Sequence, residues 1–265
     1  MNTSTFPVRS LMTFYQDAFA ILEEAHIQFL IGGAFAQSRL TQRDRDTKDL
    51  DIILRREDVP RMLAAFEHAG YRAEVPYPHW LAKIHSNDRY LDVLFGSGNG
   101  IVQVDDCWFR HARETEVLNR KVQLCPPEEL IWSKAFVQER ERFDGADVLH
   151  LLHSCARDLD WDRLLARFGH HWPVLYAHLV MFLYAYPDRR GDIPRHVIDE
   201  LTGKLKQLAP NEAERVCYGT LISREQYLHD VNVLGYEDPR LPPRGNMAPA
   251  DLEIWTAAIA RHRTG

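Results

Sequence analysis

Two kinds of hydrophobic spacing divide this chain near its middle. In the first part, short apolar runs alternate with amphipathic stretches and with glycine-rich turns, which is typical of strands that alternate with helices. After Pro126 and Pro127 the apolar residues recur every three or four positions over long stretches, as on the buried face of a helix. The pattern therefore predicts an α/β (α+β) domain over residues 1–125 and an all-helical domain over residues 126–265.

The same spacing assigns most of the individual elements. In the helix expected over residues 56–71, Asp58 is the expected N-terminal cap and Gly70 the stop signal. The predicted strands cover residues 27–31, 50–54, 80–85, 89–95, 115–119 and 121–125, the last two as a hairpin. The predicted helices cover residues 8–25, 34–40, 56–71, 128–141, 144–155, 160–168, 173–186 and 194–208, with an irregular segment and a short helix after them.

Composition places the chain among ordinary globular proteins and excludes several classes. The hydrophobic fraction is 45% and the charged fraction 26%, and the formal net charge of −6 argues against broad coating of nucleic acid. The four cysteines are widely spaced without a CxxC pair, so neither a disulfide framework nor a zinc ribbon is expected. No signal peptide is recognisable, and the longest apolar run, residues 174–186, is too short to span a membrane. We expect no membrane contact and a cytoplasmic location.

Candidate chemistry gathers around two glycines and three aspartates. Gly32 and Gly33 follow an apolar strand and open a helix, where backbone amides can approach a phosphate closely. Asp49 and Asp51 are two positions apart at the start of the next strand, so their side chains share one face. Asp92 lies inside a later strand between apolar neighbours. Carboxylates crowded in this way suit a divalent cation with oxygen ligands, whereas a D-x-D motif alone is more typical of a solvated strand end.

A glycine pair, a D-x-D motif on the next strand and a single aspartate on a later strand resemble the nucleotidyltransferase superfamily with the DNA polymerase beta-like fold. The resemblance covers roughly residues 27–95, with Gly-Gly in place of the commoner Gly-Ser. It implies a mixed sheet with flanking helices and Mg²⁺-dependent transfer of a nucleoside monophosphate from a nucleoside triphosphate to a hydroxyl acceptor, releasing pyrophosphate. It further implies that Asp49 and Asp51 hold two Mg²⁺ ions, and that Asp92 completes the metal site and favours deprotonation of the acceptor.

A second stretch, residues 128–152, carries a lysine, two arginines and a D-x-x-D motif before an apolar helix. It looks like the corresponding stretch of nucleotidyltransferases of the abortive-infection type IV toxin group. That resemblance implies functional roles for Lys134, which would neutralise charge on the leaving pyrophosphate, and for Asp147. From the residues alone, Lys134 is expected at the surface. Asp144 and Asp147 are expected to cap the helix or complement its dipole, or one of them to pair with Lys134 or Arg142.

Several alternatives stay open at this stage. Lys48, directly before the D-x-D motif, either reaches the phosphates or balances the acidic pair. The acceptor is a small molecule such as an aminoglycoside, a protein hydroxyl or a tRNA end, and the acidic net charge favours the first two. Two other classes compete with a transferase, namely a non-catalytic nucleotide-binding module of the toxin–antitoxin type and a metal-dependent phosphohydrolase. The preferred base and the oligomeric state are not determined by the sequence.

Overall fold

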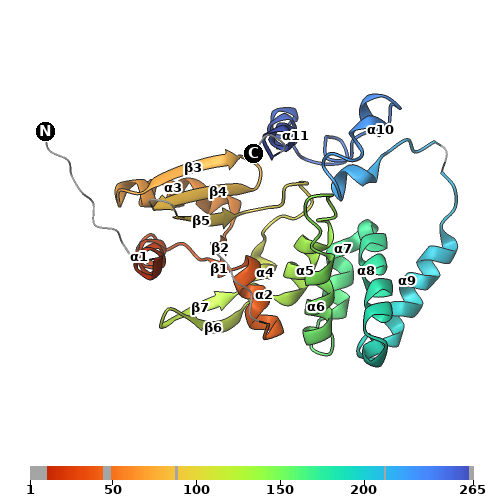
Figure 1. Cartoon of the computed structure of the whole chain (residues 1–265), viewed down its shortest axis with the longest axis horizontal. Coiled ribbons are helices and arrows are strands. Elements are labelled where there is room, and N and C mark those ends of the chain that lie inside the picture. Colours follow the sequence, from red (N-terminus) through yellow and green to blue (C-terminus); the bar gives the residue numbers. More distant parts are fainter. Residues whose placement is uncertain (1–10, 44–48, 87–88, 212, 263–265) are drawn as a thin grey trace, which may run out of the picture. The chain divides into compact units, whose positions relative to one another are not determined.

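The structure is a computed structural model that describes residues 11–43, 49–86, 89–211 and 213–262 (Figure 1). The chain forms two compact units. Every strand of the described sheet lies in the first unit, and the second unit is built mainly from helices. The first unit comprises residues 1–36, 45–96 and 104–125, and the second comprises residues 37–44, 97–103 and 126–265.

The predicted strands and helices occur along the chain in the expected order. The strands are β1 (Leu30–Ile31), β2 (Leu50–Ile53), β3 (Arg72–Tyr77), β4 (Leu81–Ser86), β5 (Arg89–Leu94), β6 (Arg113–Val117) and β7 (Arg120–Leu124). The first unit also holds α1 (Leu11–Glu24), the 3-10 turn η1 (Arg56–Asp58), α3 (Val59–His68), α4 (Asp106–Arg110) and the start of α2 (Gly33–Thr41). The second unit holds α5 (Pro127–Ala135), α6 (Gly145–Cys155), α7 (Trp161–Phe168), η2 (Gly169–His171), α8 (Trp172–Ala185), η3 (Pro187–Asp192), α9 (Arg195–Gln207), η4 (Tyr218–Leu221), α10 (Leu228–Asn232) and α11 (Pro249–His262).

The strands form one mixed sheet of seven strands in the order β3-β4-β5-β2-β1-β7-β6. β2 runs parallel to β5, and β1 runs parallel to β7, while the remaining neighbours are antiparallel. β6 and β7 form the hairpin that the sequence predicts. The mixed sheet with flanking helices in one part of the chain, and the helical region after it, confirm the predicted fold class.

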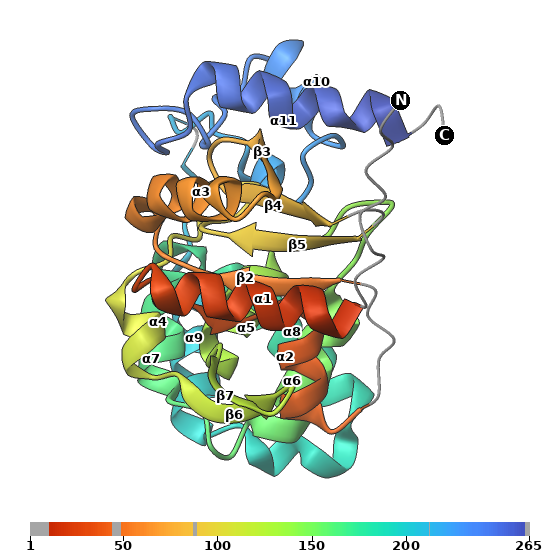
Figure 2. The ribbon, with the colours of Figure 1, turned by 90° about the vertical axis from the view of Figure 1, so that its left-hand side faces the viewer.

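One face of the central strands is apolar and is covered by two helices. Ile84, Leu91 and Val93 alternate with polar residues along β4 and β5 and are fully buried. α1 and α3 pack against each other and α3 contacts β3, while α1 lies in front of β2 in Figure 2. Phe14 of α1 contacts Tyr71, the residue after α3, at 5.5 Å between ring centroids. The helices therefore close this face and leave the polar side chains of the strands on the other.

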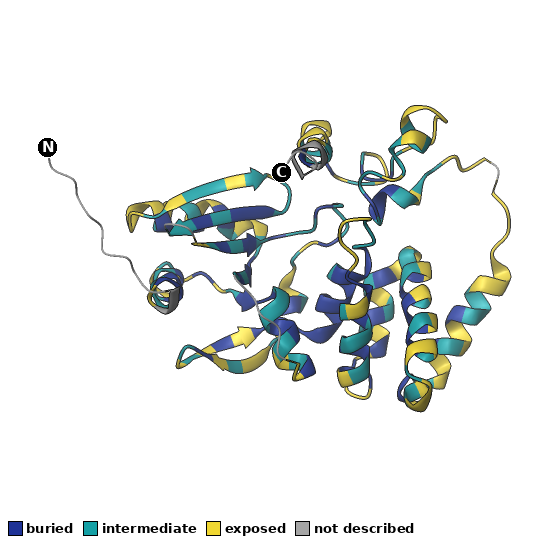
Figure 3. Ribbon diagram, viewed as in Figure 1, coloured by how far each residue is buried: buried dark blue, intermediate teal, exposed yellow. Residues whose placement is uncertain are grey.

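The second unit is organised around α8, which packs against α5, α6, α7 and α9. Leu175, Leu179 and Phe182 form its fully buried face, and the buried positions appear as dark blue along α5, α6 and α8 in Figure 3. His178 on the same helix is buried too, where its Nε2 atom lies 2.9 Å from the backbone oxygen of Ala135. Desolvation lowers the pKa of His178, so this histidine is a neutral core residue.

Three details differ from the sequence-based expectation. β3 was not predicted, and α5 ends at Ala135 although helical spacing was expected to continue to residue 141. Residues 138–142 contain no apolar side chain that could continue the buried face, and the backbone instead forms a bridge between Gln138 and Phe143. Asp58 occupies the N-cap position of α3 without a capping hydrogen bond, because its carboxylate pairs with Arg61 at 2.6 Å. Within the described ranges, no helix is both long and apolar enough to cross a membrane.

Candidate active site

Four neighbouring strands of the first unit place charged side chains in a single row. Glu74 on β3 pairs in register with Lys83 on β4, Lys83 with Asp92 on β5, and Asp92 with Asp51 on β2. Residues paired in register point to the same face of a sheet. Because Leu91 is buried on the opposite face, the row lies on the polar face of the sheet. Two aspartates that are 41 positions apart in the sequence are thus direct neighbours, as the motif required.

The carboxylate of Asp51 lies against the first residue of α2. Gly33 has a positive φ of 55°, and a Cβ atom built on it would overlap Asp51 Oδ2. The adjacent Gly32 donates its amide to the backbone oxygen of Asp51 at 2.9 Å. Glycine is required at position 33 for both its backbone conformation and this close approach. The Gly32 amide is used within the sheet, so an anion-binding role falls to the helix start at Gly33.

Asp49 lies directly before β2 and is hydrogen-bonded by a tyrosine from the neighbouring strand. The hydroxyl of Tyr90 on β5 bonds to the Asp49 carboxylate, and this bond, with burial and the nearby aspartates, raises the pKa of Tyr90 to about 12. Tyr15 of α1 fixes the backbone between the two aspartates, since its hydroxyl accepts a hydrogen bond from the Leu50 amide at 3.1 Å. Burial, with the charges of Asp49 and Asp51, raises the pKa of Tyr15. Both tyrosines are therefore neutral donors or acceptors at physiological pH.

Asp92 is held by Lys83. The Nζ atom of Lys83 lies 2.6 Å from Asp92 Oδ1 and 3.9 Å from the centroid of the Tyr90 ring, and the two charged side chains are only 22% and 20% exposed. Burial raises the pKa of Asp92, the Lys83 ammonium opposes this shift, and the charge of Asp49 adds to it. A carboxylate with a raised pKa binds a proton more readily than an ordinary aspartate does, which suits a group that accepts a proton.

The three carboxylates have the ligand type that a divalent cation requires, and they lie near one another. Mg²⁺ prefers oxygen ligands, and Asp51 and Asp92 are adjacent on one face with Asp49 two residues upstream. As the side chains stand, however, no three His, Cys, Asp or Glu residues in the described part of the chain form a group that could hold a metal ion. Lys83 already binds the carboxylate of Asp92, and Tyr90 binds that of Asp49. Asp49 and Asp51 would hold the cation, and Asp92 joins them only if its contact with Lys83 changes.

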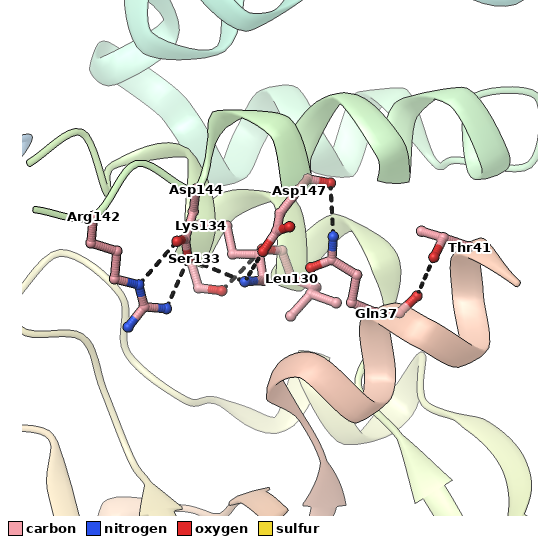
Figure 4. A network of polar contacts seen from close by, with 8 residues as sticks. All are labelled: Gln37, Thr41, Leu130, Ser133, Lys134, Arg142, Asp144 and Asp147. Atoms are coloured by element: carbon pink, nitrogen blue, oxygen red, sulfur yellow. Dashed lines mark hydrogen bonds and ion pairs between the residues drawn. The ribbon is translucent and has the colours of Figure 1, made fainter. Parts of the chain in front are cut away.

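Lys134 belongs to a buried polar network of the second unit (Figure 4). Its Nζ atom lies 2.8 Å from Asp147 Oδ2 and 3.1 Å from Asp144 Oδ2, and Arg142 binds Asp144 through two further hydrogen bonds of 2.9 Å. Gln37 of α2 donates from Nε2 to the backbone oxygen of Asp147 at 3.3 Å. The expected surface position of Lys134 is therefore wrong. Asp144 makes no capping bond at the start of α6, and both aspartates pair with Lys134.

We expect Lys134→Met to lower the free energy of unfolding by about 2 kcal/mol, measured by urea denaturation. The three side chains are 10%, 7% and 13% exposed, and removing the ammonium takes one cation from two buried carboxylates. Arg142 still compensates Asp144, which keeps the loss below that of a fully broken buried pair. Lys121→Met is the control, since the Lys121–Glu114 pair is exposed and its loss should change the free energy by less than about 0.5 kcal/mol. Equal effects of both substitutions would contradict a stabilising network around Lys134.

The described part of the chain thus brings together some of the predicted site residues. Gly33, Asp49, Asp51 and Asp92 meet at one place on the polar face of the sheet. Lys134 and Asp147 contact each other within the second unit, and Lys48 lies outside the described residues. Two further side chains at the aspartates, Lys83 and Tyr90, were missed by sequence reasoning. Their signal was alternation, because Lys83 is a charged residue between the apolar residues Ala82 and Ile84, and Tyr90 is two positions from Asp92.

The sequence matches one protein family over part of its length. Residues 16–108 match the family described as Aminoglycoside-2''-adenylyltransferase. Among curated proteins, none matches the sequence. The matched segment contains the glycine pair, the D-x-D motif and the strand-embedded aspartate described above.

Similar solved structures are distant in sequence. The solution structure of the antibiotic-resistance factor ANT(2'')-Ia shares 19% identity, with 63% of this chain and 95% of that chain covered and a TM-score of 0.44. The crystal structure of ANT(2'')-Ia in complex with adenylyl-2''-tobramycin shares 20% identity, with 59% and 93% covered and a TM-score of 0.41. The lincomycin-bound lincosamide antibiotic adenylyltransferase LnuA shares 19% identity, with 54% and 96% covered and a TM-score of 0.37. Residues 16–108 of this chain are therefore similar to a family of adenylyltransferases.

Proposed function

We propose that the protein transfers a nucleoside monophosphate from a nucleoside triphosphate to a hydroxyl group of a small molecule. The oxygen of the acceptor hydroxyl attacks the α-phosphorus, a new phosphorus–oxygen bond forms, and the bond to the bridging oxygen of the β-phosphate breaks to release pyrophosphate. The observation that carries the proposal is the register pairing of Asp51 with Asp92 beside the close contact of Asp51 with Gly33. The matched family supports the same reaction type.

Each residue of the site has a proposed role in this reaction. Asp49 and Asp51 bind the divalent cation, and Asp92 accepts the proton that the attacking hydroxyl loses. The start of α2 at Gly33 offers backbone amides and the positive end of a helix to the phosphates. The sequence-based assignment of Lys134 to the leaving pyrophosphate and of Lys48 and Asp147 to the nucleotide remains a proposal. When bound, Mg²⁺ supplies positive charge that stabilises the phosphate oxygens in the transition state.

An aminoglycoside is the acceptor that we propose to test first, with ATP as the first donor. The family matched by residues 16–108 is named for transfer to an aminoglycoside, and the net charge of −6 favours a polycationic small molecule over a nucleic acid. The helical unit is the proposed acceptor domain, in line with the predicted division at residues 125 and 126. The resemblance of Lys134, Asp144 and Asp147 to the abortive-infection type IV toxin group keeps a regulatory, toxin–antitoxin role as the second candidate.

The test is incubation of the purified protein with each nucleoside triphosphate, Mg²⁺ and a panel containing tobramycin, kanamycin and lincomycin. We expect pyrophosphate release that depends on one acceptor, and a mass increase of that acceptor equal to one nucleoside monophosphate. Asp92→Asn is the inactive control. Free nucleoside monophosphate without a modified acceptor would instead favour a phosphohydrolase. Nucleotide binding without pyrophosphate release with any acceptor, including total tRNA and protein extracts, would favour the non-catalytic module.

A further inference from the structure

We propose that Lys83 is a resident cation of the active site and takes the place of the second metal ion. The sequence resemblance implies two Mg²⁺ ions shared by Asp49, Asp51 and Asp92. The structure places a lysine ammonium on the third of these carboxylates. This inference rests on the proposed function of the site, and it predicts that the first unit binds one divalent cation and not two.

The first step of the argument is the position of Lys83 in the row of charges. Lys83 lies directly opposite Asp92 across the antiparallel pair of β4 and β5, and Asp92 lies directly opposite Asp51. The register alone therefore fixes the order of charges as positive, negative, negative. A lysine at any neighbouring position of β4 would point to the apolar face, where Ala82 and Ile84 are fully buried.

The second step is that the ammonium is held firmly. Its distance of 2.6 Å to Asp92 Oδ1 is that of a short charge-assisted hydrogen bond. The Tyr90 ring lies 3.9 Å away and adds a cation–π contact, and the hydroxyl of the same tyrosine binds Asp49. Tyr90 thus links the ammonium at one aspartate to the carboxylate of another. A mobile surface lysine would lack both contacts.

The third step is electrostatic. A second Mg²⁺ bridging Asp51 and Asp92 would compete with Lys83 for the same Asp92 carboxylate and would be repelled by the ammonium at short range. An ion held by Asp49 and Asp51 keeps its ligands and is farther from this charge. Because the ammonium occupies Asp92, this aspartate is not a metal ligand. Asp92 can then accept the proton of the attacking hydroxyl. Lys83 is in this sense a positioning residue for Asp92, since its contact is with the aspartate.

The experiment counts bound Mn²⁺ by electron paramagnetic resonance in protein stripped with EDTA, without nucleotide. We expect one Mn²⁺ per chain for the wild type and for Lys83→Arg, which keeps the positive charge. Lys83→Met should bind two, and the second ion should disappear again in the double variant Lys83→Met, Asp92→Asn. Two ions in the wild type, or an equal count in the wild type and Lys83→Met, would overturn the inference.

Thermal melting separates this role from a purely structural ion pair. In EDTA, Lys83→Met should melt at a lower temperature than the wild type, because Asp92 loses its cation beside Asp49 and Asp51. Added Mn²⁺ should reverse most of the decrease in melting temperature of this variant. If Lys83 formed only a structural ion pair, Mn²⁺ would not reverse the decrease. If neither wild type nor variant binds Mn²⁺, the inference fails together with the proposed metal site. If the wild type binds one Mn²⁺ and Asp51→Asn none, but Lys83→Met changes nothing, only the role of Lys83 fails.

Discussion

Replacement of Asp51 by asparagine is expected to lower kcat/KM for nucleotidyl transfer about a thousandfold or more, which corresponds to about 4 kcal/mol of transition-state stabilisation. Asparagine keeps the size of the side chain that lies against Gly33, but it removes the charge that we assign to cation binding. The measurement is the rate of pyrophosphate release with the acceptor identified from the panel. Mn²⁺ binding by the same variant should be lost in parallel.

The fold should tolerate this substitution, and that distinguishes a catalytic loss from unfolding. Asp51 lies directly opposite Asp92 on a parallel strand, and like charges in this position are destabilising. Without a divalent cation, Asp51→Asn should therefore melt at the same temperature as the wild type or higher. Glu74→Gln is the matched control, because Glu74 belongs to the same row of charges but lies at its far end on β3. A similar loss of rate in both variants, or a lower melting temperature for Asp51→Asn, would contradict the assigned role.

Much of the fold was predictable because burial imposes a strict spacing on the sequence. β5 alternates buried and more exposed positions, β2 and β4 are short runs rich in buried apolar residues, and the long helices of the second unit present regular apolar faces. β3 escaped prediction for the opposite reason. None of its residues is buried, it contains Pro76, and it lies at the edge of the sheet, where one side of a strand makes no ladder hydrogen bonds. An exposed edge strand has no hydrophobic pattern to reveal it.

The motif predicted the carboxylates and the glycine of the candidate site, but not the contacts between them. Asp49 and Asp51 are fixed relative to each other by strand geometry, and Gly33 by the turn before α2. The pairing of Asp51 with Asp92 depends on the register of two parallel strands, which no local pattern determines. The same holds for Lys83 and for the network of Lys134, where long-range contacts replace the expected solvent exposure. The sequence motif therefore identified the aspartates, whereas the lysines that pair with them are placed by contacts between distant parts of the chain.

Gly33→Ala is the second substitution with a large expected effect, because it changes both the stability and the activity. The left-handed backbone of residue 33, with φ of 55°, disfavours alanine by about 1 kcal/mol, and the new methyl group must displace the Asp51 carboxylate. We expect a total loss of about 3 kcal/mol in the free energy of unfolding, measured by urea denaturation. Because a displacement of about 1 Å at a reacting group can lower a rate a hundredfold, kcat/KM should fall at least about a hundredfold.

Gly70→Ala separates backbone strain from the clash. Gly70 has φ of 85°, and a Cβ atom there would meet no heavy atom of the described residues within 4 Å. This variant should lose only about 1 kcal/mol and keep its activity. Adding Asp51→Ala to Gly33→Ala removes the carboxylate that the methyl group overlaps, so the double variant should regain stability while staying inactive. If Gly33→Ala is no less stable than Gly70→Ala and remains active, Asp51 does not lie against the start of α2. The N-terminus of α2 and the proposed metal-binding carboxylate of Asp51 would then be separate features and not one site.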